Sequence, residues 1–267
     1  MNRRITCFRC GSKKLYKIRR GKRRCFDCGY EFTPWLIRGL RLSKKSWRKI
    51  AEWFVLERSG WWIAQEVGLG KNQTYRALNK IRQLITFDVP DVFSGTVEVD
   101  ETYLGGQKKN KRKSQLKKDK AQGRESKKGF GTTKQPVFGI LCRSGKVFAK
   151  LVDETEAKDL IPIITKKVSF GTRICSDTWR AYTGLAAKGY VHRTVEHRKK
   201  EYAKGKNHIN GLEGFWGYLK RKLAAKGGVR RKYLSLFLGE YVWRYNNRKT
   251  TTKEQTKKIL ELLKVSG

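Results

Sequence analysis

The stretch Thr96-Val97-Glu98-Val99-Asp100-Glu101-Thr102-Tyr103 alternates apolar and acidic side chains over its first five residues. Because successive side chains of a β-strand point to opposite faces, this alternation predicts a strand that carries Glu98 and Asp100 on one face. A single acid at such a place is weak evidence for chemistry. A chemical role for these acids therefore depends on where the other acids lie along the chain.

The segments after this strand predict the rest of an α/β domain. Residues 136–142 and 146–152 are β-rich runs separated by Ser144-Gly145, which predicts a hairpin. Residues 159–168 have a helical pattern, and residues 172–177 form another short strand that ends in Asp177. Between the first strand and the hairpin, residues 107–135 contain twelve Lys and Arg, which predicts a basic loop.

A third acid lies on a predicted helix over residues 208–222. Its apolar stripe is formed by Leu212, Phe215, Trp216 and Leu219, and Glu213 lies beside that stripe. An acid at the edge of a core-facing stripe, in so basic a chain, needs a lysine or a metal ion as its partner. An Asp such as Asp177 caps a helix more often than it performs chemistry, but three spaced acids together favour a site.

The N-terminal part contains two Cys-x-x-Cys pairs, Cys7 with Cys10 and Cys25 with Cys28, with fourteen residues between the pairs. Four thiolates in this spacing favour a tetrahedral structural zinc site, here a zinc ribbon with a basic hairpin between the pairs. The alternative is a pair of disulfides or a set of unrelated thiols. Since Met1-Asn-Arg-Arg leads to Cys7 and not to an apolar run, we expect no secretory signal, and disulfides are disfavoured.

Residues 43–90 predict three short helices with glycine-containing turns at Gly60 and at Gly68-Leu69-Gly70, the pattern of a helix-turn-helix. The third helix is predicted to present DNA-contacting side chains outward: Gln73, Thr74, Arg76, Ala77 and Lys80. The alternative is an ordinary three-helix unit with a solvated basic face.

The charge of the chain favours a polyanionic partner. Its 267 residues include 63 Lys+Arg against 23 Asp+Glu, a formal net charge of +40. This excess is typical of nucleic-acid binding. The aromatic content of 12% can build a packed core, which disfavours wholesale disorder, and no stretch is apolar enough to span a membrane.

Three ordered motifs carry a resemblance to a known family: residues 97–106, residues 176–182 and residues 208–221. Together they resemble the DDE transposases of bacterial insertion sequences, and more narrowly the group related to Merlin elements, which has an N-terminal zinc ribbon. The segment 240–248 is similar to the C-terminal helix of that group. The resemblance covers nearly the whole chain.

The resemblance implies an RNase-H-like core in which Asp100, Asp177 and Glu213 hold two Mg²⁺ ions, which Mn²⁺ is expected to replace. It implies cleavage of DNA at the element ends, after which the freed 3′-OH attacks target DNA in line. Lys220 and Arg221 are expected to hold the DNA backbone, with surface solvation as the alternative. In some members of the group the third acid is replaced by Asn or His; this chain retains Glu213, and Asn210 and His208, one turn upstream, are the alternatives. With Glu213 as the ligand, His208 and Asn210 are expected to neighbour the metal ligands.

The expected organisation is a multidomain chain with a zinc ribbon over 1–35, a helix-turn-helix over 43–90, the α/β RNase-H-like catalytic domain over 95–250, and a C-terminal tail over 251–267. The expected partners are double-stranded DNA, at element ends and target, and further copies of the chain in a dimer or larger synaptic complex. The expected location is the cytoplasm, at the nucleoid. The alternatives are a non-catalytic DNA-binding regulator and a nuclease of the same fold.

Overall fold

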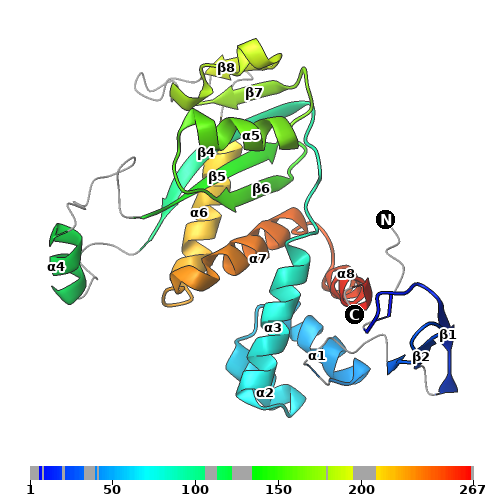
Figure 1. Cartoon of the computed structure of the whole chain (residues 1–267). Helices are drawn as coiled ribbons and strands as arrows, with labels where there is room; N and C mark the ends of the chain where they lie inside the picture. Colours follow the sequence, from blue (N-terminus) through cyan, green and yellow to red (C-terminus); the bar gives the residue numbers. More distant parts are fainter. Residues whose placement is uncertain are drawn as a thin grey trace. The chain divides into compact units, whose positions relative to one another are not determined.

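The computed structural model describes residues 6–7, 9–19, 22–32, 40, 42–105, 113–121, 134–178, 180–194 and 209–265. The chain divides into two compact units (Figure 1). The first unit combines Met1–Asp88 with Asn247–Gly267, and the second is Val89–Asn246.

The first unit begins with a small antiparallel sheet of three strands, β1 (Leu15–Lys17), β2 (Arg23–Cys25) and β3 (Glu31–Phe32). In the β1–β2 hairpin, Leu15 pairs with Cys25 and Lys17 with Arg23. The hairpin therefore lies between the two cysteine pairs, where the sequence predicts it.

Three helices follow, α1 (Lys44–Val55), α2 (Gly60–Val67) and α3 (Lys71–Ile85). The Ser43 hydroxyl caps α1 by accepting a hydrogen bond from the Ser46 N–H at 3.0 Å, and Ser59 caps α2 in the same way. Gly68 ends α2 with φ of 67°, a left-handed conformation that glycine adopts without strain. The predicted helices and turns are thus present.

The C-terminal tail forms a fourth helix of this unit, α8 (Thr252–Val265), which packs against α1 and α3. Its Ile259 and Leu263 are buried, and the Lys258 ammonium lies 2.7 Å from the Asp88 carboxylate at the end of the helical segment. The sequence predicted only a tail here, because its apolar stripe cannot be assigned to a partner without the tertiary structure.

The second unit is built on a five-stranded mixed sheet in the order β6-β5-β4-β7-β8. β4 (Thr96–Leu104) is central; it pairs antiparallel with β5 and parallel with β7. The other strands are β5 (Gln135–Cys142), β6 (Val147–Leu151), β7 (Arg173–Ser176) and β8 (Val191–Thr194). The predicted strand over Thr96–Tyr103 and the predicted hairpin are therefore confirmed.

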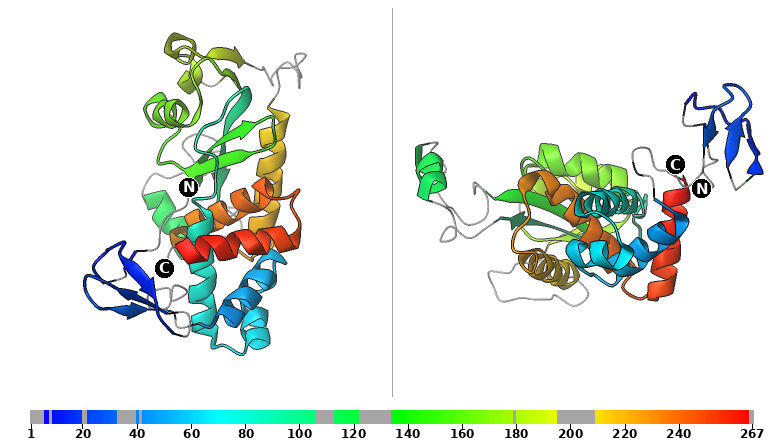
Figure 2. Two further views of the ribbon diagram at one scale, coloured as in Figure 1. Left: turned by 90° about the vertical axis from the view of Figure 1, so that its right-hand side faces the viewer. Right: turned by 90° about the horizontal axis from the view of Figure 1, so that it is seen from below.

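Helices cover both faces of this sheet, as Figures 1 and 2 show for the described residues. α5 (Ala157–Lys167) packs on the face to which Val97 and Val99 point, whereas α6 (Asn210–Ala224) and α7 (Leu234–Asn246) pack on the other. Short 3₁₀ turns are found at Arg180–Tyr182, Ala186–Lys188 and Arg231–Tyr233. None of the described helices combines the length and hydropathy needed to cross a lipid bilayer.

The predicted basic loop over 107–135 contains a helix among its described residues, α4 (Lys113–Ala121), and its last residue already belongs to β5. The loop prediction is therefore wrong for this part. Lys, Gln, Leu and Ala have high helix propensity, so a segment can be helical even without an apolar stripe.

The end of α7 is tied to the edge strand β6 by the side-chain amide of Asn246. Its Oδ1 accepts a hydrogen bond from the Val147 N–H at 2.7 Å, and its Nδ2 donates to the Val147 carbonyl at 2.8 Å. The buried amide thus satisfies the backbone N–H and carbonyl of Val147 as the backbone of a neighbouring strand would.

We predict that Asn246→Ala lowers the free energy of unfolding by about 2–4 kcal/mol, because it leaves the buried N–H and carbonyl of Val147 without partners. Urea denaturation followed by circular dichroism measures the change. The exposed Lys249 is the control, since Lys249→Ala should change stability by less than about 0.5 kcal/mol. Equal stability of both variants would show that water replaces the amide.

Candidate active site and metal centre

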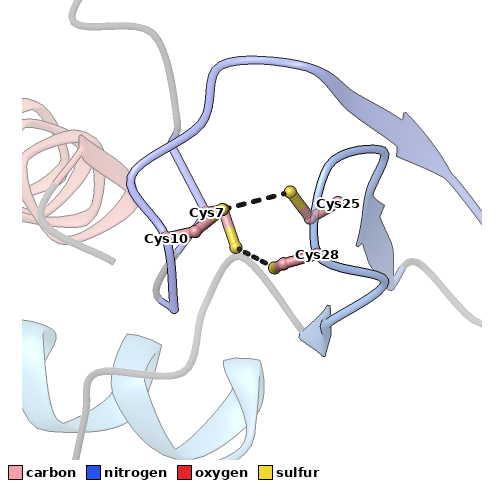
Figure 3. A group of neighbouring side chains, drawn as sticks. All are labelled: Cys7, Cys10, Cys25 and Cys28. Atoms are coloured by element: carbon pink, nitrogen blue, oxygen red, sulfur yellow. Dashed lines mark hydrogen bonds between the residues drawn. The ribbon is translucent and has the colours of Figure 1, made fainter.

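The four N-terminal cysteines converge in the first unit (Figure 3). Their sulfur atoms all lie within 4.8 Å of one another, with Cys7 to Cys28 and Cys10 to Cys25 each at 3.5 Å. A disulfide needs about 2.05 Å between sulfurs, so these separations are those of free thiols. The predicted meeting of the two pairs is confirmed.

This cluster fits a structural zinc ion. Four sulfurs about 2.3 Å from a tetrahedral zinc lie about 3.8 Å apart, close to the separations found here. The backbone N–H of Arg9 donates to Cys7 Sγ at 3.4 Å, a contact that favours a thiolate. Since the four thiolates would fill the coordination shell, such an ion has no open position for a substrate.

The strands of the second unit set Asp177 beside Asp100. In the parallel β4–β7 pair, Val97 lies opposite Ile174 and Glu98 opposite Cys175. Continued by two residues, this register brings Asp177, just beyond the end of β7, next to Asp100 on β4. Parallel strands end at the same edge of a sheet, so two acids distant in sequence become neighbours there.

Glu98 attaches α6 to the sheet. Its carboxylate is 1% exposed and accepts a hydrogen bond from the Leu212 N–H, in the first turn of α6, at 2.9 Å. The Arg143 guanidinium lies 3.6 Å away on its other side. A negative charge at a helix N-terminus is favourable, and this one determines where the first turn, which carries Glu213, begins.

Trp216 makes a second link between α6 and β4. Its indole N–H donates to Asp100 Oδ2 at 2.9 Å. Gly139 pairs with Asp100 across the sheet, and a Cβ at Gly139 would lie 2.6 Å from carbons of the Trp216 ring. The absence of a side chain at Gly139 therefore lets the indole reach the carboxylate.

These placements concentrate negative charge around Asp100. Burial raises the pKa of Asp100 to about 7, and the Asp177 and, to a smaller extent, Glu213 carboxylates act in the same direction. The hydrogen bond from Trp216 opposes the rise. Among the described residues, the four cysteine thiols form a compact group of possible metal ligands. The carboxylate oxygens of Asp100, Asp177 and Glu213 lie farther apart than these thiols.

Glu101 lies on the opposite face of β4 from Asp100 and accepts a short hydrogen bond from the Tyr182 hydroxyl. Burial raises the pKa of Glu101 to about 8, the bond from Tyr182 opposes this, and the charges of Asp100 and Asp177 add to it. Glu98 and Glu101 thus both have protein partners.

The remaining residues expected on α6 differ in their surroundings. Glu213, Lys220 and Arg221 are exposed, and Asn210 is the exposed first residue of the helix. Partial burial of the ammonium lowers the pKa of Lys220, whereas the Asp100 carboxylate raises it, so the two charges interact. His208 lies outside the described residues.

On α3, the expected outward side chains fall into two groups. Arg76 is exposed, and Gln73 and Lys80 are partly exposed. Thr74 and Ala77 are buried, and the Thr74 hydroxyl donates to the Gly70 carbonyl at 3.3 Å, so their assignment to the outer face is wrong. Both lie on the helix stripe that includes Leu78 and Ile81 and faces the core.

Sequence reasoning overlooked the anchoring role of Glu98 and the polar role of Trp216. One general signal was available for the tryptophan, because a buried indole N–H usually finds an acceptor. No local signal identifies the acceptor, since Trp216 and Asp100 lie 116 positions apart.

We predict that the purified chain carries one zinc ion and that Cys10→Ser abolishes its retention, because three thiolates hold the ion far less tightly than four. Elemental analysis after dialysis against a chelator measures this. Cys142→Ser should retain the metal, since Cys142 lies outside the cluster. Zinc retained by Cys10→Ser would exclude the four-thiolate site.

We predict that Gly139→Ala destabilises the second unit by about 1–3 kcal/mol, because the new methyl group overlaps the Trp216 ring. Denaturant unfolding and the near-ultraviolet circular dichroism of tryptophan measure the effect. Gly214→Ala on α6 is the matched control: nothing lies within 4 Å of its added Cβ, so it should be neutral or stabilising by up to about 1 kcal/mol. An unchanged stability of Gly139→Ala would mean that the ring moves freely.

Comparison with known proteins identifies the family of this chain. Residues 92–246, which include all three candidate acids, match the ISXO2-like transposase domain. The chain is also 32% identical, over 121 residues, to a Haemophilus influenzae protein described as an uncharacterized transposase-like protein. That alignment covers 45% of this chain and 96% of the relative. The resemblance seen in the sequence motifs is thereby confirmed: the chain belongs to the ISXO2-like family of insertion-sequence transposases.

Proposed function

We propose that this transposase cleaves DNA at the ends of its insertion sequence and joins the freed 3′ ends to target DNA at the site around Asp100. The observation that carries the proposal is the convergence of three acids: the β4–β7 register brings Asp177 beside Asp100, and the charges of Asp177 and Glu213 both raise the pKa of Asp100. Because neighbouring carboxylates disfavour one another's ionised forms, a bound cation would stabilise the charged forms of these three acids.

The sheet supports an RNase-H-like core for this domain. Three antiparallel strands, β6, β5 and β4, continue into two parallel strands, β7 and β8. In this arrangement Asp100 lies on the first strand of the domain, Asp177 follows the fourth, and Glu213 lies on a later helix. This order is the one that the family resemblance implies.

The donor set fits magnesium, or manganese in its place, because these hard cations prefer carboxylate oxygens. We assign Asp100 as the shared ligand of two ions, with Asp177 and Glu213 as the outer ligands. When bound, two such ions neutralise charge on the attacking and leaving oxygens of phosphodiester transfer.

The chain's own residues orient this site and hold the DNA. The hydrogen bond between Glu98 and the Leu212 N–H positions the first turn of α6 and therefore Glu213. The Trp216 indole N–H donates to one carboxylate oxygen of Asp100 and orients that side chain. Lys220, whose charge interacts with Asp100, and the exposed Arg221 lie further along α6 and would contact phosphates of the DNA backbone. Asn210, at the exposed start of α6, is proposed to hydrogen-bond with the ligands.

We further propose that α3 reads the terminal repeats through Gln73, Arg76 and Lys80, which are at least partly exposed. Two element ends must meet before joining, so the active form is a dimer or larger assembly on DNA.

The test is strand transfer on a DNA fragment that bears the element's own ends, in Mg²⁺ and in Mn²⁺. Asp177→Asn should reduce joined product by about 10³-fold or more, since each 1.36 kcal/mol lost from transition-state stabilisation costs tenfold in rate. Asp153→Asn, an exposed acid outside the cluster, is the matched control and should keep full activity.

Fluorescence anisotropy with the same DNA should give equal affinity for wild type, Asp177→Asn and Asp153→Asn in the absence of divalent metal. Cleavage without joining by the wild type would favour a nuclease. Tight DNA binding without cleavage by any of the three proteins would favour a DNA-binding regulator.

A further inference from the structure

A groove of about 1260 Å³ lies between α1 and α8 in the first unit. Its walls carry six basic side chains and two acidic ones. The basic residues are Lys44, Lys45, Arg48, Lys253, Lys257 and Lys264, and the acidic residues are Glu52 and Glu261. None of these side chains belongs to the helix α3 proposed to read bases.

The cations are arranged in rows along both walls. Lys253 and Lys257 are one helical turn apart on α8, so they share a face of that helix, and both are exposed. Lys44, Lys45 and Arg48 occupy the first two turns of α1 on the opposite wall. Arg48 lies 4.0 Å from Glu52, so one of the two acids is offset by a cation within the wall itself.

The floor of the groove is apolar. Trp53 is partly exposed, and Leu56 is 49% exposed although it borders a packed helical unit. Lysine stems can lie along such a surface while their ammonium groups remain in water. A partner with closely spaced anions and some apolar surface between them is complementary to this groove.

We propose that the α1–α8 groove binds the sugar-phosphate backbone of duplex DNA. Phosphates supply regularly spaced negative charges for the two rows of cations, and the deoxyribose carbons supply apolar surface for the floor. The contact carries no base sequence information, because phosphate contacts position a protein on DNA and base contacts specify the site. This inference rests on the proposed function, since it takes DNA as the partner.

The C-terminal helix therefore has a role in DNA binding as well as in packing. α1 and α8 are far apart in the sequence and form the groove only when α8 folds back onto α1. The site adds a backbone contact to the proposed base reading by Gln73, Arg76 and Lys80.

The test uses the full-length, zinc-loaded chain and two fluorescent duplexes, one with the element's end and one of unrelated sequence. Affinity is measured by anisotropy between about 50 and 200 mM NaCl, the range in which counterion release strongly affects binding. The variant is Lys253→Ala/Lys257→Ala. Alanine keeps helix propensity high, and circular dichroism checks that the helices are retained.

The slope of log affinity against log salt should become shallower by roughly 1.8 in the variant, the value for two lost phosphate contacts. At about 0.1 M salt the affinity should fall by roughly 10- to 60-fold, and equally for both duplexes. By contrast, Arg76→Ala should weaken binding mainly to the element's end.

Lys49→Ala/Lys166→Ala is the matched control. It removes the same net charge from exposed positions outside the groove and should leave the slope within the error of wild type. If the groove variant behaves like this control while wild type binds DNA, the groove proposal is wrong and DNA binding stands. If the wild type binds neither duplex, both fail.

Poly-L-glutamate, labelled and titrated in the same way, tests an acidic protein as occupant. If the groove variant loses affinity for this polymer but keeps the wild-type affinity and salt slope for both duplexes, the groove is a site for protein docking and the DNA proposal is overturned.

Discussion

Two carboxylates on one face of β4, the buried Glu98 and the partly buried Asp100, receive hydrogen bonds from donors of the protein. Glu98 accepts a hydrogen bond from the Leu212 N–H, and Asp100 accepts one from the Trp216 indole N–H; both donors lie on α6. An unpaired buried carboxylate is costly, so these two bonds restrict the position and rotation of α6 on the sheet. The location of Glu213, and with it the candidate site, follows from that restriction.

The same face shows why small residues accompany the acids. Gly139 leaves room for the Trp216 ring beside Asp100, and a Cβ at Gly211 would lie 2.9 Å from the Glu98 carboxylate. The sheet and the helix approach each other closely at both places. A backbone N–H can then donate to Glu98 and an indole N–H to Asp100.

The electrostatic arrangement separates two kinds of surface. In the second unit, neighbouring carboxylates raise the pKa values of Asp100 and Glu101. The α1–α8 groove of the first unit is lined by six basic and two acidic side chains. In a chain of net charge +40, the two kinds of surface therefore favour ligands of opposite charge: anions at the groove and cations at the carboxylates.

Much of this organisation could be predicted from the sequence because it depends on local patterns. The alternation at 96–100 places Glu98 and Asp100 on one face of a strand, and the Cys-x-x-Cys spacing predicts that four thiols meet. Ser43, Ser59 and Gly68 mark helix ends by their intrinsic capping and backbone preferences. Each of these signals involves residues only a few positions apart.

The tertiary structure alone determined which residues contact one another across the fold. The bonds of Glu98 to Leu212 and of Asp100 to Trp216 span 114 and 116 positions, and Asp177 reaches Asp100 only through the register of two parallel strands. The burial of Thr74 and the docking of α8 onto α1 likewise depend on which helix face meets another. Periodicity determines that a face is apolar or acidic, but the contact it makes is determined by sheet register and helix packing, which no local pattern contains.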